Sequence, residues 1–395
     1  MPLDALPRRS PRLAATALRV PAPPIPACRA WADGFQGHRI DLTQAVPGEP
    51  PPAELLRRIA AAAADPAIAR YGLLEGEPAL RDAYAEELRL TYGGDVAAED
   101  VRITAGANTA FNLAMSAIAA PGDAVLLPAP WFFNHQMSLA LRGVEALALP
   151  CRPDAGFLPD FDQAAAMLGP RVRALVLVTP NNPTGAVMPP ELIARFAELC
   201  RERGTWLVLD ETYRDFLPEA HGAPHDLFQR GDWRDFVVQI YSFSKAYCIP
   251  GHRMGAVTAG PAFTDAFMKA VDNIQICPPR PPQHGLAWAI PALRSWRRAQ
   301  ARTMQQRGEA IRACLRTAPA WQLDAQGGYF AWLRIPASAP DAATVAELLA
   351  RDHGVVTLPG SVFGPGGDRH LRLAYPQLTE DDMAEAARRL HAFSR

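Results

Sequence analysis

The chain alternates between segments with a helical period of apolar residues and short runs of consecutive apolar residues. In the segment 77–93, apolar residues recur every four positions, which predicts one buried face of a helix. These positions are Leu80, Tyr84, Leu88 and Tyr92. The segment 189–204 also predicts a helix, because proline stands at its start and glycine at its end. Apolar runs predict strands at 101–104, 123–130, 144–150, 173–180, 205–211, 236–242 and 255–260.

This order of elements predicts the fold class. Continuous apolar strands separated by helices are typical of a mostly parallel sheet covered on both faces, so we expect an α/β fold with a seven-stranded sheet. The last part of the chain differs. Strands predicted at 327–335 and 370–376 alternate with helices predicted at 341–353 and 379–394, which indicates a smaller α+β domain.

Composition excludes several classes of protein. The 395 residues carry a net charge of −1, which offers no electrostatic footprint for nucleic acid or an anionic membrane. No apolar run reaches the roughly 20 residues of a membrane span. The segment 1–26 is basic, but its prolines interrupt any apolar stretch, so we expect an irregular arm rather than an export signal. We therefore expect a cytoplasmic protein.

Cysteine and histidine positions do not predict a metal site. The six cysteines are scattered without a C-x-x-C motif, which is typical of reduced thiols. His221 and His225 are four residues apart, but Pro224 opposes a helix there, and no third ligand is evident. We expect no bound metal.

The lysines are a more specific signal. Of the 40 basic residues, only Lys245 and Lys269 are lysines, which points to a coding bias toward arginine. A lysine that is retained despite this bias is therefore a stronger candidate for a functional residue than a lysine in an ordinary composition. Lys245 stands between the hydroxyls of Ser242 and Ser244 and the turn that contains Arg253. Lys269 lies in a segment that predicts an exposed helix position.

Polar residues follow four of the predicted strands. Ligands of parallel sheets bind at the carboxyl ends of the strands, so these residues are expected to converge on one site. They are the turn Gly106, Ala107 and Asn108 after 101–104, Asn182 after 173–180, Asp210 and Tyr213 at the end of 205–211, and Lys245 after 236–242.

Their chemistry indicates what they hold together. The turn at Gly106 opens a helix, whose N-terminus is suited to a phosphate, and Ser242, Ser244 and Arg253 could add donors. An unprotonated lysine amine forms a Schiff base with an aldehyde, which arginine cannot do. A buried Asp210 needs a cationic partner. A phosphate, an aldehyde and a protonatable ring nitrogen together describe pyridoxal 5'-phosphate.

The ordered set of motifs resembles the class I and II aminotransferases of pyridoxal-phosphate fold type I, from about residue 40 to the C-terminus. The motifs are Tyr71-x4-Gly76-x3-Leu80-Arg81, Ala105-Gly106-Ala107-Asn108, Asn182-Pro183-Thr184-Gly185, Asp210-x2-Tyr213, Ser242-x-Ser244-Lys245-x7-Arg253-x-Gly255 and Leu371-Arg372-Leu373. The resemblance implies an N-terminal arm that joins the small domain at 1–45, a large cofactor-binding domain at 46–285 and a small C-terminal domain at 286–395.

The resemblance also implies roles at the cofactor. Lys245 would form the internal aldimine and move protons during the reaction. Asp210 would keep the pyridine nitrogen protonated, which makes the ring an electron sink. Tyr213 and Asn182 would bind the phenolic oxygen of the ring and tune the imine.

Three bulky residues near 130 have related roles by resemblance. Phe132 would stack on the ring, with Trp131 as the alternative. His135 would stand behind Asp210, although an ordinary core histidine is an equally good interpretation.

The substrate side of the site is implied less completely. Arg372 would clamp the substrate α-carboxylate, because a planar guanidinium makes two parallel hydrogen bonds. Tyr71 would reach the cofactor phosphate of a neighbouring subunit, which implies a homodimer with shared sites. Ala45 stands near the substrate where the family often has glycine. Gln275 aligns with the arginine that aspartate-type members use to hold a second carboxylate, so a dicarboxylate substrate is not supported. Arg280 lies nearby and keeps that alternative open.

These features predict an aminotransferase that moves an amino group between an L-amino acid and a 2-oxo acid by a ping-pong mechanism. A second interpretation keeps the fold and cofactor but makes the enzyme a C–S β-lyase, or an amino-acid oxidase or cyclase, because the pocket selects which bond breaks. A third is a regulatory module without turnover, but no segment remains for a helix-turn-helix. The motifs do not name the amino donor.

Overall fold

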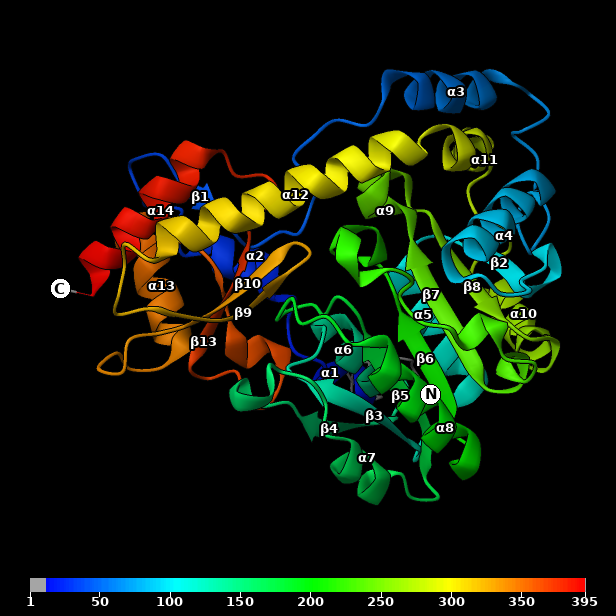
Figure 1. The fold of residues 1–395 in the computed structure, drawn as a ribbon, viewed down its shortest axis with the longest axis horizontal. Coiled ribbons are helices and arrows are strands. Elements are labelled where there is room, and N and C mark those ends of the chain that lie inside the picture. Colours follow the sequence, from blue (N-terminus) through cyan, green and yellow to red (C-terminus); the bar gives the residue numbers. More distant parts are fainter. Residues whose placement is uncertain (1–11, 395) are drawn as a thin grey trace, which may run out of the picture.

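The computed structural model describes residues 12–394, and its centre is a seven-stranded sheet (Figure 1). The strands are β2 (Val101–Thr104), β3 (Ala124–Ala129), β4 (Glu145–Pro150), β5 (Val172–Val178), β6 (Trp206–Asp210), β7 (Val237–Ser242) and β8 (Gly255–Ala259). Their spatial order is β2-β8-β7-β6-β5-β3-β4. Only β8 runs antiparallel to its neighbours. The predicted mostly parallel α/β sheet is therefore confirmed.

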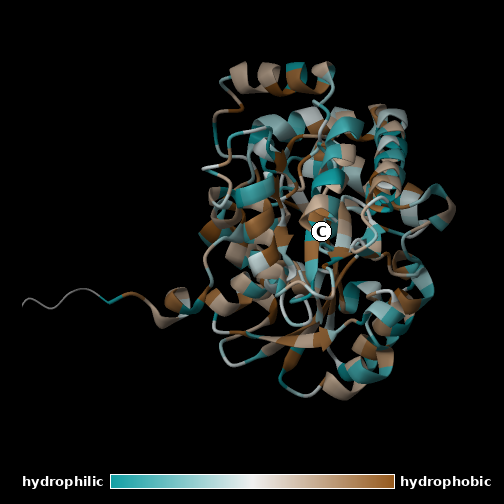
Figure 2. Ribbon diagram, turned by 90° about the vertical axis from the view of Figure 1, so that its left-hand side faces the viewer, coloured by the Kyte–Doolittle hydropathy of each residue, from teal (hydrophilic) through white to brown (hydrophobic). Residues whose placement is uncertain are grey.

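Helices cover both faces of this sheet, as continuous apolar strands require. The helices of this part of the chain are α3 (Ala53–Ala64), α4 (Pro78–Tyr92), α5 (Ala107–Ile118), α6 (Phe133–Leu141), α7 (Phe161–Met167), α8 (Pro190–Arg203), α9 (Phe243–Ala246), α10 (Pro261–Ile274) and α11 (Arg280–Ala292), of which α3 packs on α11 rather than on the sheet. In β5, Leu175 and Leu177 face a core shared with α4, α8 and α11. Ala174 and Val176 point the other way, to a core shared with α5, α6 and α10. In Figure 2, the helices around the sheet accordingly alternate between hydrophilic and hydrophobic residues along their length.

A smaller antiparallel sheet lies at the other end of the molecule (Figure 1). Its order is β12-β13-β10-β9, from β9 (Gln322–Gly327), β10 (Phe330–Arg334), β12 (Leu358–Pro359) and β13 (His370–Ala374). Helices α13 (Ala342–His353) and α14 (Glu380–Phe393) accompany it. The 22-residue helix α12 (Arg294–Leu315) runs from the large sheet to this part of the fold.

The strand predicted at 327–335 is present as β10, but it begins later than predicted, and the strand before it was missed. The structure instead has a hairpin, in which β9 ends at Gly327 and β10 begins at Phe330. Gly328 makes the turn with φ +53°, a conformation that glycine adopts without steric cost. The polar sequence of β9 hid the first strand, because all six of its residues are at least partly exposed.

The N-terminal segment is more regular than the predicted irregular arm. It contains two short helices, α1 (Ala15–Arg19) and α2 (Pro24–Ala30), and the strand β1 (Ile40–Asp41). β1 pairs in parallel with β11 (Val355–Val356), so it joins the small-domain side of the fold. The first part of the predicted arm, 1–11, lies outside the described residues. The division of the sequence into 1–45, 46–285 and 286–395 remains a prediction.

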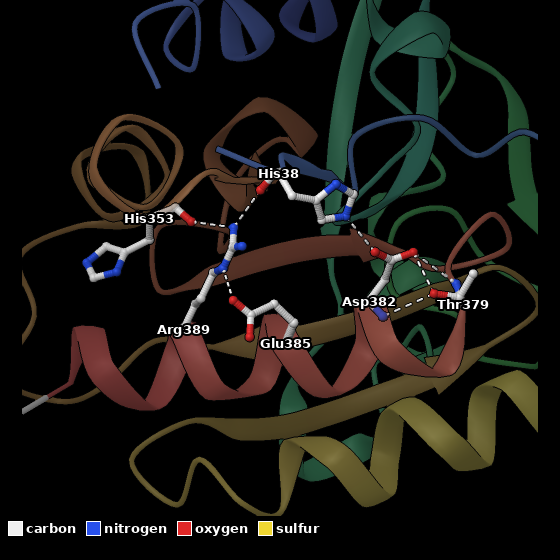
Figure 3. A network of polar contacts seen from close by, with 6 residues as sticks. All are labelled: His38, His353, Thr379, Asp382, Glu385 and Arg389. Carbon is white, nitrogen blue, oxygen red and sulfur yellow. Dashed lines mark hydrogen bonds and ion pairs between the residues drawn. The ribbon is translucent and has the colours of Figure 1, made fainter. Parts of the chain in front are cut away.

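Polar contacts tie this segment to α14 (Figure 3). His38 Nε2 lies 2.7 Å from a carboxylate oxygen of Asp382, which also caps the helix through Thr379. Arg389 donates to the backbone oxygens of His38 and His353, at 2.8 Å each. These contacts hold the chain just before Gln44 and Ala45, which line the central cavity described below.

Membrane-spanning helices and clusters of metal ligands are both absent from the part of the chain that the structure describes. Between residues 12 and 394, no helix combines the length and apolarity that a membrane crossing needs. In the same span, no three His, Cys, Asp or Glu side chains gather as metal ligands. All six cysteines are unpaired.

Candidate active site

A cavity of about 470 Å³ lies at the carboxyl ends of β5, β6 and β7, where the sequence placed the polar residues. The predicted residues that line it are Ala45, Ala107, Asn108, Phe132, Asn182, Asp210, Tyr213, Ser242, Ser244, Lys245, Arg253 and Arg372. Two predicted residues are not in the lining: Gly106, which precedes α5, and Tyr71. The structure therefore brings together groups from both sheets and from the N-terminal segment.

Lys245 lies in the short helix α9, directly after β7. Its Nζ donates a hydrogen bond to the backbone oxygen of Ala45 at 2.5 Å. Burial, helped by the positive charges of Arg253 and Arg372, lowers the pKa of the Lys245 amine from 10.5 to about 8. A neutral amine is the reactive form, so these surroundings favour nucleophilic chemistry at this residue.

Asp210 ends β6 and is buried beside two donors. His135 Nε2 lies 3.1 Å from its carboxylate. The hydroxyl and backbone N–H of Thr212 donate to Asp210 Oδ1 at 2.7 and 3.0 Å. Burial alone would raise the pKa of Asp210, but His135 and Thr212 together hold it below its ordinary value. Asp210 is thus a stable anion at the cavity wall, and His135 occupies the position behind it that the resemblance implied.

The N-terminus of α5 faces the Arg253 guanidinium. Gly106 has φ +93°, and a Cβ at this position would lie 2.4 Å from Arg253 Nη2, so only glycine fits. Arg253 itself has a left-handed backbone with φ +53° and donates to the backbone oxygen of Pro250 at 3.0 Å. The Ser242 hydroxyl accepts from the N–H of Ser244. A helix N-terminus, two hydroxyls and a guanidinium form an arrangement suited to a phosphate.

Arg372 comes from β13 of the small sheet and is only 2% exposed. It donates to Asn182 Oδ1 at 3.1 Å and to the backbone oxygen of Thr43. Its Nε is buried without a hydrogen-bond partner. Burial lowers the pKa of Arg372 to about 10. A buried guanidinium with a spare donor is suited to an anionic ligand, such as a carboxylate.

The two candidates for ring stacking occupy different places. Phe132 lines the cavity and contacts His135 edge-on, with ring centroids 5.3 Å apart. Trp131 is not in the cavity lining and packs against Gly364 instead. The geometry therefore favours Phe132 as the stacking residue. Tyr213 lines the cavity too, and burial raises the pKa of its phenol.

The remaining predicted residues lie outside the cavity. Tyr71 is 80% exposed, so within one chain it contacts no bound ligand there. The Gln275 side chain accepts from the backbone N–H of Ala105 at 2.7 Å. Arg280 donates to Glu77 at 2.6 Å and to the backbone oxygen of Ala67 at 2.8 Å. Gln275 and Arg280 are thus both engaged in holding backbone and loop structure.

Sequence reasoning missed one wall of the cavity. It consists of the N-terminal residues Pro23, Pro24, Ile25 and Pro26, with Gln44 and Val46, and of Phe133 and Asn134 at the start of α6. The proline-rich stretch was visible in the sequence, but nothing local shows that it would fold over a site formed some 200 residues later.

The lining residues fit pyridoxal 5'-phosphate. The cradle at Gly106 and Arg253 would hold the phosphate, the Asp210 anion would face a protonated ring nitrogen, and the Lys245 amine would bind the aldehyde carbon. The unpartnered Nε of Arg372 leaves a donor for a substrate carboxylate. Charge and donor type therefore match each part of the cofactor and its amino-acid substrate.

Comparisons with known proteins agree with this geometry. The family model described as aminotransferase class I and II matches residues 38–390. An aromatic aminotransferase of Arabidopsis thaliana is 30% identical over 360 residues, which cover 89% of this chain and 88% of that protein. An arginine–pyruvate transaminase of Pseudomonas aeruginosa is 30% identical and covers 81% of each chain.

Solved structures show the same fold. The aspartate aminotransferase of Thermus thermophilus, solved with maleate, superposes with a TM-score of 0.88 at 25% identity, covering 97% of this chain and all of the other. Substrate-bound BacF of Bacillus subtilis gives a TM-score of 0.90 at 23% identity, with 97% and 98% covered. The chain is therefore an enzyme of the class I and II aminotransferase family, which depends on pyridoxal 5'-phosphate.

Proposed function

We propose that this aminotransferase moves an amino group between an L-amino acid and a 2-oxo acid by a ping-pong mechanism, with Lys245 as the residue that holds the cofactor covalently. The observation that supports this most is the Lys245 amine, whose pKa is lowered to about 8, in one cavity with Asp210 and Arg372. The relatives above are named for different amino donors, so their names support amino transfer rather than one donor.

The side chains divide the work. Arg372 binds the substrate α-carboxylate through its spare donor and turns the α-hydrogen toward Lys245. When bound, pyridoxal 5'-phosphate supplies the electron sink for the charge that develops at the α-carbon. Asp210, held as an anion by His135, keeps a proton on the ring nitrogen. Lys245 would take the proton from the substrate α-carbon and deliver it to the former aldehyde carbon of the cofactor, on the other side of the amino nitrogen.

Two residues tune the site rather than transfer protons. Tyr213 and Asn182 bind the phenolic oxygen of the ring. Asn182 is in turn positioned by its hydrogen bond from Arg372, which connects the substrate clamp to the ring. Because Arg372 is on the small sheet and Asn182 follows β5 of the large sheet, this contact joins the two parts of the fold.

We also propose that the active enzyme is a homodimer with shared sites. The exposed phenol of Tyr71 cannot serve the cavity of its own chain, but it could reach the phosphate of a neighbour. Other large apolar side chains are exposed near it in the sequence or at the end of α10. They are Leu73, Ile274 and Ile276. A second copy would cover such apolar surface.

The decisive experiment is a half-reaction screen of the purified holoenzyme. Each common amino acid is added without a 2-oxo acid, and the absorbance of the cofactor is followed. Transamination predicts stoichiometric conversion to the pyridoxamine form, and reversal when a 2-oxo acid is added. Continuous release of ammonia and pyruvate from cysteine-type substrates would instead identify a lyase, and consumption of oxygen would identify an oxidase. Either result without the reversible half-reaction would overturn the proposal.

A further inference from the structure

One wall of the cavity is apolar and comes from two places in the chain. Pro24 and Ile25 belong to α2, and Phe133 begins α6. Behind them lies an apolar cluster that links these elements to the small sheet, and Ile25 packs on it. The buried members of the cluster are Cys28, Phe133, Phe157, Trp332, Leu358 and Phe363.

The charged groups of the cavity are few, and each has a task in the proposed function. Among the lining residues they are Asp210, Lys245, Arg253 and Arg372. Asp210 is held as an anion by His135 and Thr212 and would face the ring nitrogen of the cofactor. The other three serve the aldehyde, the phosphate and the α-carboxylate. Among the residues that this chain contributes to the lining, no cation is left for a second carboxylate and no anion is left for a basic substrate side chain.

Both residues near the expected position of a second-carboxylate group, Gln275 and Arg280, are engaged elsewhere. Arg280 forms a salt bridge with Glu77 at 2.6 Å and holds the loop before Tyr71. Gln275 holds the backbone of Ala105. To bind a distal carboxylate, Arg280 would have to leave a partly buried carboxylate unpaired, which costs free energy.

We propose that the side chain of the substrate is uncharged and apolar, aliphatic or aromatic, and that it packs against Ile25 and Phe133. This inference rests on the proposed function, because it takes Arg372 as the α-carboxylate clamp. An apolar side chain gains free energy when it leaves water for this wall. A carboxylate would lose its hydration there and find no partner. Ile25, from the N-terminal segment, is therefore a specificity-determining residue.

Binding of unreactive acids to the holoenzyme tests this without turnover. 4-Methylpentanoate and butanedioate have the same shape, with an isopropyl group in place of the second carboxylate, and both offer one carboxylate to Arg372. We expect calorimetry to give a Kd for 4-methylpentanoate lower by about 10-fold or more, as the burial of such a side chain predicts. Equal or tighter binding of butanedioate, or no measurable binding of 4-methylpentanoate, would overturn the proposal.

Variants at one position locate the subsite. Ile25→Ala should weaken 4-methylpentanoate several-fold, and Ile25→Arg should weaken it further while tightening butanedioate. Leu18→Ala is the matched control, since Leu18 lies in α1, is 68% exposed and does not line the cavity. Equal affinities in wild type and Ile25→Ala would remove Ile25 from the subsite, even if Ile25→Arg did not fold.

Failure of this inference is distinguishable from failure of the proposed function. If apolar acids bind tightly but no amino acid undergoes the half-reaction, the apolar subsite is supported and the proposed transamination is rejected. If aspartate or glutamate reacts readily and apolar acids bind weakly, the proposed transamination is supported and the apolar subsite is rejected.

Discussion

The Nζ atom of Lys245 lies 2.5 Å from the backbone oxygen of Ala45, so a residue from the N-terminal segment contacts the expected nucleophile directly. The preceding residues also serve the site, because the backbone oxygen of Thr43 accepts from Arg372. One short stretch thus touches both the group that would hold the cofactor and the group that would hold the substrate. Its anchoring to α14 through His38 therefore bears on the geometry of the whole cavity.

Replacement of Lys245 tests its covalent role. We expect Lys245→Ala to retain binding of pyridoxal 5'-phosphate through the phosphate cradle but to lose transamination by many orders of magnitude, because a covalent attachment is lost. The matched control is Lys269→Ala, at an exposed position of α10, which should behave as wild type. The readouts are the absorbance of the cofactor and peptide mapping after borohydride reduction. An adduct on Lys269, or on no lysine, would contradict the assignment.

The pH dependence of apoenzyme stability tests the lowered pKa of Lys245. The folded pKa of about 8 lies below the ordinary 10.5, so the folded state binds this proton more weakly than the unfolded state. Protonation then destabilises the fold fully below pH 8, and the effect fades as the pH rises from 8 through 10.5, above which the amine is neutral in both states. Its full size is about 3 kcal/mol.

Lys245→Met removes this penalty. Urea unfolding at pH 7, 9 and 10.5 should show that the advantage of the Lys245→Met apoenzyme over the wild-type apoenzyme shrinks as the pH rises. Any packing gain from methionine is the same at every pH, so only the change with pH reports the lysine. A difference that stays constant over this range would show that the pKa of Lys245 is not lowered.

Arg372→Lys separates a two-point clamp from a simple charge. Lysine keeps the charge but replaces a planar fork with a point donor, so we expect a loss of about 2–4 kcal/mol in kcat/KM for α-amino acids. The loss should largely vanish for amines without a carboxylate. The control is Arg334→Lys on the neighbouring strand β10, where the arginine pairs with Asp324 outside the cavity. Wild-type kcat/KM in Arg372→Lys would place the clamp elsewhere.

Mixing two inactive variants tests the shared site. If Tyr71 completes the site of a neighbour, Lys245→Ala and Tyr71→Phe subunits that exchange should form a heterodimer with one intact site. Activity should then rise on mixing, measured after exchange is confirmed by mass spectrometry. Activity that does not rise, or a stable and fully active monomer, would argue against the proposed dimer.

A buried ion-pair network at the start of α12 predicts an effect on stability alone. Arg297 is buried and pairs with Glu87 and with Asp215, the latter at 2.6 Å. Arg297→Met leaves two buried carboxylates without this partner, so we expect a loss of about 3–5 kcal/mol in the free energy of unfolding. The adjacent Arg298 is exposed, and Arg298→Met should change little. Equal effects of the two substitutions would show that the network adds no stability.

Local sequence determined the elements and the chemical inventory of this protein. The period of apolar residues placed the seven strands of the large sheet and helices such as α4 and α8 to within a few residues, because burial of one face or both is a local property of the chain. Polar residues that follow parallel strands meet at one edge of the sheet, and this rule predicted that Asn182, Asp210 and Lys245 lie in the same cavity. Their roles remain predictions for the experiments above.

Only the tertiary structure decided which distant groups meet. His135 stands behind Asp210 across 75 positions of sequence, Phe132 rather than Trp131 lines the cavity, and Pro24 and Ile25 close one wall of it. The strand β9 was missed for a related reason, since its polar residues pair in the sheet without an apolar signal. The period of apolar residues shows which face of a segment is buried, but it does not show which other segment packs against that face. The packing of the N-terminal segment and the small sheet onto the large one sets those contacts, and with them the substrate side of the site.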